Sequence, residues 1–166
     1  MLVSDFAQID RPFDAVRDQL VEAGPGWLGE SLVAAYEEGE RLSLRVSSAI
    51  GPLRVSKRVW AELDEMAVKP DRVTQSLRWR AAGATGLFPS MAADLEFTPM
   101  GTAMTSISFM GRYVPPLGPV GREVDRVLLH RLAQASVRAL LARVVERLRE
   151  GAEASLRVGK TSPAVG

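Results

Sequence analysis

The sequence of 166 residues predicts an α+β fold, in which a curved antiparallel β-sheet of about six to seven strands wraps around a long C-terminal α-helix. Three observations predict it. Apolar and polar residues alternate along the middle of the chain, as expected for strands with one face on a core and one in water. Short turns separate these segments, which favours an antiparallel meander. The last part of the chain carries the longest helical pattern, and that helix is the available cover for the apolar sheet face.

A first strand and two short helices are expected before the meander. Residues 2–10 predict the strand, and Pro12 suits the first turn of a helix, where its missing N–H would have no partner anyway. Apolar side chains then recur at helical spacing at Phe13, Val16, Leu20 and Val21. The glycines and proline of residues 24–26 end this helix. Residues 27–40 predict the second helix, whose Trp27 either gates a pocket or packs the helix on the sheet.

Five alternating segments make up the expected meander. They cover residues 42–46, 55–63, 73–80, 91–97 and 105–113. Turns are expected at residues 51–52, 70–71, 82–86 and 99–101, because glycine or proline stands in each of these segments.

The closing helix is expected from Val120 to about Glu150, a length of roughly 45 Å at 1.5 Å per residue. Its apolar stripe consists of Ala133, Val137, Leu140, Leu141, Val144 and Leu148. Residues 151–166 lack an apolar period, so a flexible tail is expected there. The chain is therefore expected to form a single domain over residues 1–150 followed by that tail.

Composition narrows the classes of function. The formal net charge of +1 gives no electrostatic case for nucleic acid. The chain has no cysteine and one histidine, which argues against disulfides, thiolate chemistry and a multi-histidine metal site. We therefore expect no metal and no cofactor. The absence of a signal-like segment and of a long apolar run predicts a cytoplasmic protein without a membrane span, as a monomer or homodimer.

The order of these elements resembles the START-like superfamily called SRPBCC, which includes polyketide cyclases and lipid-transfer domains. The matching segments are residues 9–16, where the first strand passes into a Pro-led helix, residues 95–99 and 105–109 in the late strands, and the long closing helix. The resemblance implies a helix-grip fold with an apolar cavity between the sheet and the long helix. It does not imply a reaction, because such folds host enzymes, carriers and regulatory modules alike.

Candidate contacts for a ligand come from residues in phase with the expected inner faces. They are Lys57, Gln75, Trp79 and Tyr113 on strands, and Arg126, His130, Val137 and Leu141 on the closing helix. Gln75 could bond a ligand carbonyl, Trp79 could stack on a ring, and the cations could meet an acidic group. Each also has a structural interpretation: Gln75 and Trp79 as core residues, Lys57 at a bulge or rim, and the helix cations in water.

Three functions are compatible with this pattern. The first is a binding module for a small hydrophobic or aromatic molecule, such as a lipid or polyketide. The second is an enzyme of the aromatase/cyclase or dehydratase type, with His130 and Tyr113 transferring protons within one pocket. The third is a protein-interaction domain with a closed core, for which an exposed apolar patch on the outer sheet face would be the mark. Charged outer positions argue against such a patch; they are Arg54, Arg58, Arg78, Arg80, Asp94 and Glu96.

Overall fold

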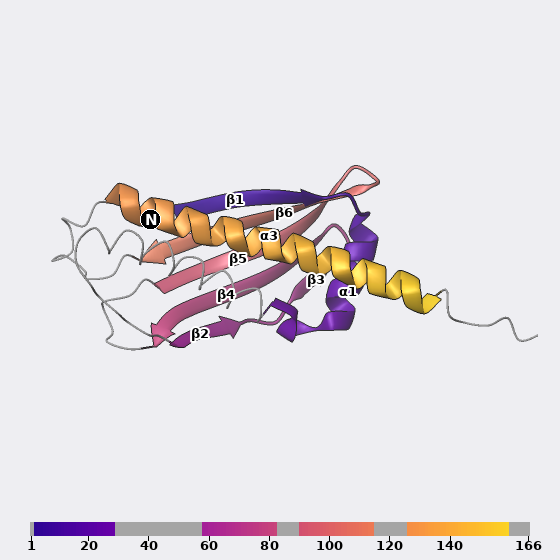
Figure 1. Cartoon of the computed structure of the whole chain (residues 1–166), viewed down its shortest axis with the longest axis horizontal. Coiled ribbons are helices and arrows are strands. Elements are labelled where there is room, and N and C mark those ends of the chain that lie inside the picture. Colours follow the sequence, from indigo (N-terminus) through magenta and orange to yellow (C-terminus); the bar gives the residue numbers. More distant parts are fainter. Residues whose placement is uncertain (1, 29–57, 83–89, 115–125, 160–166) are drawn as a thin grey trace, which may run out of the picture.

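The computed structural model describes residues 2–28, 58–82, 90–114 and 126–159. The elements follow the order that Figure 1 labels. They are β1 (Leu2–Ile9), α1 (Phe13–Ala23), the 3-10 helix η1 (Pro25–Leu28), β2 (Arg58–Leu63), β3 (Ala67–Lys69), β4 (Arg72–Ala82), β5 (Ser90–Met100), β6 (Met104–Val114) and α3 (Arg126–Gly159).

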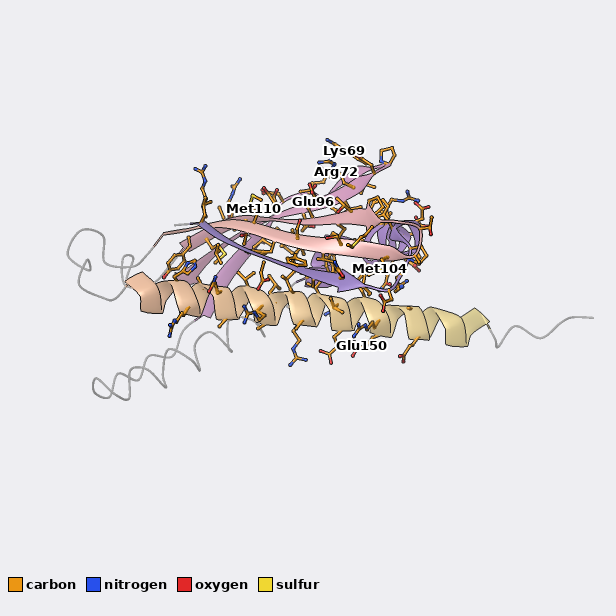
Figure 2. The ribbon with its side chains drawn as sticks, turned by 90° about the horizontal axis from the view of Figure 1, so that it is seen from above. Lys69, Arg72, Glu96, Met104, Met110 and Glu150 are labelled. Carbon is orange, nitrogen blue, oxygen red and sulfur yellow. The ribbon has the colours of Figure 1, made fainter. Side chains whose placement is uncertain are left out.

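The six strands form one antiparallel sheet in the order β1-β6-β5-β4-β2, with β3 also paired to β4. Helix α3 crosses one face of this sheet from end to end (Figure 1), and the two layers are seen edge-on in Figure 2. Helix α1 packs against β5, β6 and α3. A curved antiparallel sheet gripped by one long C-terminal helix is a helix-grip fold, so the predicted fold class is confirmed.

The core lies between the sheet and α3, where the strand alternation and the helix stripe meet. All six residues of the expected stripe on α3 are buried: Ala133, Val137, Leu140, Leu141, Val144 and Leu148. The facing strands bury alternate residues, including Leu95 and Phe97 on β5 and Ile107 and Phe109 on β6. Each such large apolar side chain contributes about 1.5–3 kcal/mol through burial.

The pairing of β2 and β3 with β4 is interrupted by a β-bulge. Leu63 at the end of β2 lies opposite Leu77, and Ala67 at the start of β3 lies opposite Thr74. Three residues, 64–66, therefore face only two on β4, residues 75–76. One extra residue on one strand of an antiparallel pair is the definition of a bulge, which bends the strand and leaves ladder groups without their usual partners. The turn predicted at residues 70–71 is confirmed, as it joins β3 to β4.

The end of β1, α1 and α3 are held together by Arg11. Its Nη1 donates hydrogen bonds to Oε1 of Gln19 on α1 and, at 2.6 Å, to the backbone carbonyl oxygen of Leu148 on α3. The hydroxyl of buried Thr105 donates at 2.8 Å to the carbonyl oxygen of Arg11. These bonds fix the angle at which the chain leaves the sheet and enters α1.

The closing helix is longer than expected. It continues to Gly159, whereas the sequence predicts its end near Glu150 and a flexible tail from residue 151. Gly151 does not end the helix. A Cβ at this position would overlap the side-chain amide of Gln19 on α1, which would have to move to make room. The following residues include strong helix formers, which extend a helix that has already nucleated. The expected division into a domain of residues 1–150 and a tail stays a prediction.

Two further differences concern the N-terminal helices. The helix begins at Phe13, so Pro12 takes the N-cap position rather than the first turn. Trp27 and Leu28 belong to η1, and the rest of the second expected helix, residues 29–40, lies outside the described residues. The first alternating segment, 42–46, lies outside them as well.

Candidate functional site

The size of the buried side chains on the inner face of the sheet changes along the length of α3. At the end covered by α1, large side chains fill the space, with Phe97, Ile107 and Leu148 all buried. Towards the N-terminal half of α3, small residues stand among large ones: Ala93 lies directly opposite Gly111 on the next strand, and Ala133 is the buried residue of the helix stripe there. Met91 and Tyr113 are large and buried next to this pair.

Gly111 lies in the interior of β6, where a side chain is normally expected. A Cβ at this position would lie 3.0 Å from the Cβ of Ala93, 3.0 Å from Cε1 of Phe109 and 3.3 Å from Sδ of Met91. Glycine inside a strand often marks a close approach of neighbouring groups, and here the neighbours are the ring of Phe109 and the side chains of β5. The shape of this part of the inner face thus depends on the missing side chain.

Tyr113 places a phenol two residues further along the same face. It lies opposite Met91 and is 5% exposed. Burial raises the pKa of Tyr113 above its ordinary value of 10, because a phenolate loses its hydration. The side chain is therefore a neutral phenol at physiological pH and can donate a proton in a hydrogen bond.

The candidate contacts on α3 fall into two groups. Val137 and Leu141 are buried in the stripe that faces the sheet, and His130 is partly exposed one turn before Ala133. Arg126 is the first residue of α3, but its side chain lies outside the description. The same holds for the side chain of Trp79 on β4, which is paired with Met91 and Ala61, and Lys57 lies outside the described residues altogether.

Gln75 is fully buried on β4, and its side-chain amide bonds to the backbone of the bulged segment. Its Nε2 donates at 2.6 Å to the carbonyl oxygen of Asp64 and at 3.1 Å to that of Ser76. The backbone N–H of Asp64 also donates to the Ser76 carbonyl oxygen, at 3.1 Å. The side-chain oxygen Oε1 of Gln75 is buried without a hydrogen-bond partner. The amide thus satisfies a carbonyl in the bulge, as the core interpretation of Gln75 requires, and leaves one acceptor over.

Trp27 is a buried residue for which the sequence allows two roles: it gates a pocket, or it packs the helix on the sheet. It is 5% exposed, and its ring lies against Phe97 with the ring centroids 5.8 Å apart and the planes at 59°. The packing interpretation therefore describes its ring. Its indole Nε1 is buried without a hydrogen-bond partner, and no sequence pattern could have shown this, because it follows from tertiary contacts.

The side chains on the outer face of the sheet differ between β1 and β6 on one side and β4 and β5 on the other. Leu2, Phe6 and Met110 on β1 and β6 are each about two-thirds exposed, and Met110 points away from α3 in Figure 2. Phe6 lies opposite Ser108, two residues from Met110, so the two apolar side chains are diagonal neighbours. Of the charged positions expected to break up such a patch, Arg78 on β4 and Asp94 on β5 are exposed, whereas Arg54 lies outside the described residues. The protein-interaction alternative stays a prediction.

The described part of the chain holds neither a candidate metal site nor a helix that could span a membrane. No group of three or more histidine, aspartate or glutamate side chains there is arranged to hold a metal ion. None of the helices in those ranges is long and apolar enough to cross a lipid bilayer.

Several solved structures are similar to the chain over most of its length. A conserved protein from Geobacillus kaustophilus is 10% identical, with a TM-score of 0.45 over 88% of this chain and 96% of that one. Norcoclaurine synthase from Thalictrum flavum, solved with dopamine and hydroxybenzaldehyde, is 8% identical, with a TM-score of 0.38 over 88% and 87%. The aromatase/cyclase Zhui from a Streptomyces species is 14% identical, with a TM-score of 0.37 over 89% and 94%. No protein-family model and no curated protein matches the sequence.

Proposed function

We propose that the protein binds a small hydrophobic or aromatic molecule, of lipid or polyketide type, between the inner sheet face and α3. The observation that carries the proposal is a group of small inner-face residues, Ala93, Gly111 and Ala133, beside the buried phenol of Tyr113. Apolar walls with a few placed polar groups are the usual lining of such sites. Tyr113 supplies one polar group there, and Val137 and Leu141 supply apolar wall.

The remaining candidate contacts are part of the same proposal. His130, Arg126 and Lys57 would meet the polar end of the ligand, and Trp79 would stack on its ring. We further propose a cytoplasmic protein, a monomer or homodimer that needs no metal or cofactor. The lack of cysteine fits a reducing compartment.

Native mass spectrometry of the protein purified from its own host tests this proposal. We expect a second species, heavier by the mass of a small molecule, which disappears when the same sample is denatured. A matched variant, Ala133→Phe, places a large side chain among the small residues of the inner face. It should lose the heavier species while keeping its circular dichroism. The proposal is wrong if wild-type protein shows only the mass of the chain and takes up no apolar compound supplied to it.

A second candidate function is a cyclase, aromatase or dehydratase, and the burial of Tyr113 favours it. A neutral phenol in an apolar environment is a suitable hydrogen-bond donor to the oxygen of a carbonyl group as negative charge develops on it in a reaction of this class. His130, at the N-terminal half of α3, would be its partner in proton transfer. Incubation with an aromatic polyketone should then give water loss or ring closure that Tyr113→Phe and His130→Gln each abolish. Unchanged conversion in both variants would rule this function out.

A further inference from the structure

Strand β1 lies at an end of the strand order and pairs with β6 alone among the described strands. Proline, lysine, arginine and bulges are common features that keep an edge strand from pairing with another chain. Residues 2–9 contain no proline, lysine or arginine, and their pairing with β6 runs without a bulge. The pairing of β2 and β3 with β4, by contrast, carries the bulge at residues 64–66. The edge of β1 is therefore suited to accept a further strand.

The even-numbered residues of β1 direct their backbone groups to this open edge. In an antiparallel pair, only every second pair of opposite residues exchanges backbone hydrogen bonds. The backbone N–H of Phe6 donates at 2.9 Å to Oδ1 of Asp5, so it points away from β6. Pro99 of β5 has no N–H and lies opposite Thr105, so Thr105 directs its backbone groups to Ile9 of β1 instead. Odd-numbered residues of β1 therefore bond to β6, and even-numbered ones present N–H and C=O groups at the edge.

Apolar side chains line the outer face beside these backbone groups. Leu2, Phe6 and Met110 are each about two-thirds exposed. Met110 lies opposite Ser4, so it is a diagonal neighbour of both Leu2 and Phe6. Figure 2 views the molecule from the side of β1 and shows α3 along the inner face of the sheet. The edge thus combines backbone hydrogen-bonding groups with exposed apolar side chains, a combination that marks a site of strand pairing.

We infer that β1 pairs in antiparallel orientation with β1 of a second copy of the chain. A twofold axis through the edge at Phe6 then joins the two sheets into one continuous sheet. This inference goes beyond the proposed ligand-binding function, because it concerns a different surface of the molecule.

The position of the axis follows from the side chains that it brings together. An axis through a residue keeps the two inner faces on the same side, whereas an axis between two residues does not. An axis at Asp5 sets two carboxylates opposite each other, which is destabilising. An axis at Ser4 or Ala7 shortens the paired stretch to residues 2–6 or 5–9. An axis at Phe6 pairs residues 3–9, sets ring against ring and places Asp5 opposite Ala7.

Charge complementarity favours a second copy as the occupant. With the axis at Phe6, Asp10 comes level with Leu2 of the second copy. Leu2 lies opposite Arg112 on β6, and Asp10 and Arg112 are both exposed. An acidic and a basic side chain of different copies are thereby brought to the same row of the sheet. The twofold symmetry repeats this arrangement at the other end of the paired strands.

Asp5 is the one charged residue of β1, and it keeps its partner when the strands pair. Its Oδ2 lies 3.4 Å from Nε of Arg138 on α3 of the same chain. Its Oδ1 accepts the hydrogen bond from the N–H of Phe6. Pairing replaces the second contact alone, because this N–H then donates to the carbonyl oxygen of Phe6 in the second copy. The carboxylate is thus not left unpaired in the interface.

A single introduced cysteine tests the position of the axis, because the chain has no cysteine of its own. Residues of a hydrogen-bonded antiparallel pair have Cα atoms about 5.5 Å apart, which a disulfide spans. We expect Phe6→Cys to form a disulfide-linked dimer under oxidised glutathione at least about tenfold faster than Ser4→Cys. Met110→Cys is the matched control, since Met110 is equally exposed on the neighbouring strand, and it should not cross-link.

Sedimentation velocity of the unaltered chain measures the dimer itself, and we expect a dimer fraction that rises with protein concentration. Phe6→Lys sets two like charges opposite each other and should raise the dissociation constant at least about tenfold. Met110→Lys places the same charge one strand away and should change it by less than about threefold. Circular dichroism checks that both variants are folded. An unaltered chain that is monomeric at every concentration overturns the inference, and so does equal cross-linking of Phe6→Cys and Met110→Cys.

Discussion

The guanidinium of Arg11 donates a 2.6 Å hydrogen bond to the backbone carbonyl oxygen of Leu148, 137 positions later in the chain. Arg11 follows β1 directly, and Leu148 belongs to the buried stripe of α3. Burial lowers the pKa of Arg11, because its charge loses hydration. The hydrogen bonds to Leu148 and Gln19 offset that cost and hold the helix in its grip on the sheet.

Replacing Arg11 by methionine tests this contact. We expect Arg11→Met to lower the free energy of unfolding by about 1–3 kcal/mol, since two charge-assisted hydrogen bonds are lost and a buried carbonyl loses one partner. Urea denaturation measures the change. Arg143→Met is the matched control, because Arg143 pairs with Glu146 on the exposed side of the same helix; it should change stability by less than about 0.5 kcal/mol. Equal effects of the two substitutions would contradict the role given to Arg11.

Gly111 offers a test of packing on the inner face. We expect Gly111→Ala to destabilise the protein by about 1–3 kcal/mol, because the added Cβ would lie 3.0 Å from atoms of both Ala93 and Phe109. Combining it with Phe109→Leu should cost less than the sum of the two single changes, since the smaller side chain makes room. A double-mutant cycle by urea denaturation measures this coupling. Strict additivity would show that the two residues do not share the space.

The raised pKa of Tyr113 predicts that the stability of the protein depends on pH. Its pKa is raised in the folded protein, so the folded state holds the phenolic proton more tightly than the unfolded state. The resulting stabilisation is fully present below the unfolded pKa of about 10 and is lost as the pH rises through the higher folded value.

Absorbance of the ionised phenol measures this shift directly. The chain has two tyrosines, so a Tyr36→Phe variant leaves Tyr113 as the single titrating phenol. We expect ionisation above pH 10 in folded protein and near pH 10 in urea. Tyr113→Phe should remove the corresponding loss of stability at high pH. Ionisation at the same pH in both states would contradict the burial of the phenol.

The sequence predicts the architecture well, because period-two and helical patterns report directly which face of each element is apolar. The stripe of α3 and the inner positions of β5 and β6 follow from those patterns. Gln75, Tyr113, Val137 and Leu141 are buried where their phase in the pattern places them.

The rest depends on contacts between segments far apart in the chain. Gly151 looks like a helix end, but it is a point of close approach to Gln19. The bulge at residues 64–66 is a matter of register between strands, which the alternation of one strand does not specify. The unpaired Nε1 of Trp27 exists only because η1 folds onto Phe97.

Methyl chemical shifts measured by NMR during titration with 2-naphthol test the central claim most directly. If the ligand binds between the sheet and α3, the methyl groups of Val137 and Leu141 shift with a common dissociation constant. Those of Leu2 and Val68, which are exposed on strands β1 and β3, stay in place. Shifts at Leu2 with none at Val137 and Leu141 would place binding on the outer face and contradict the account.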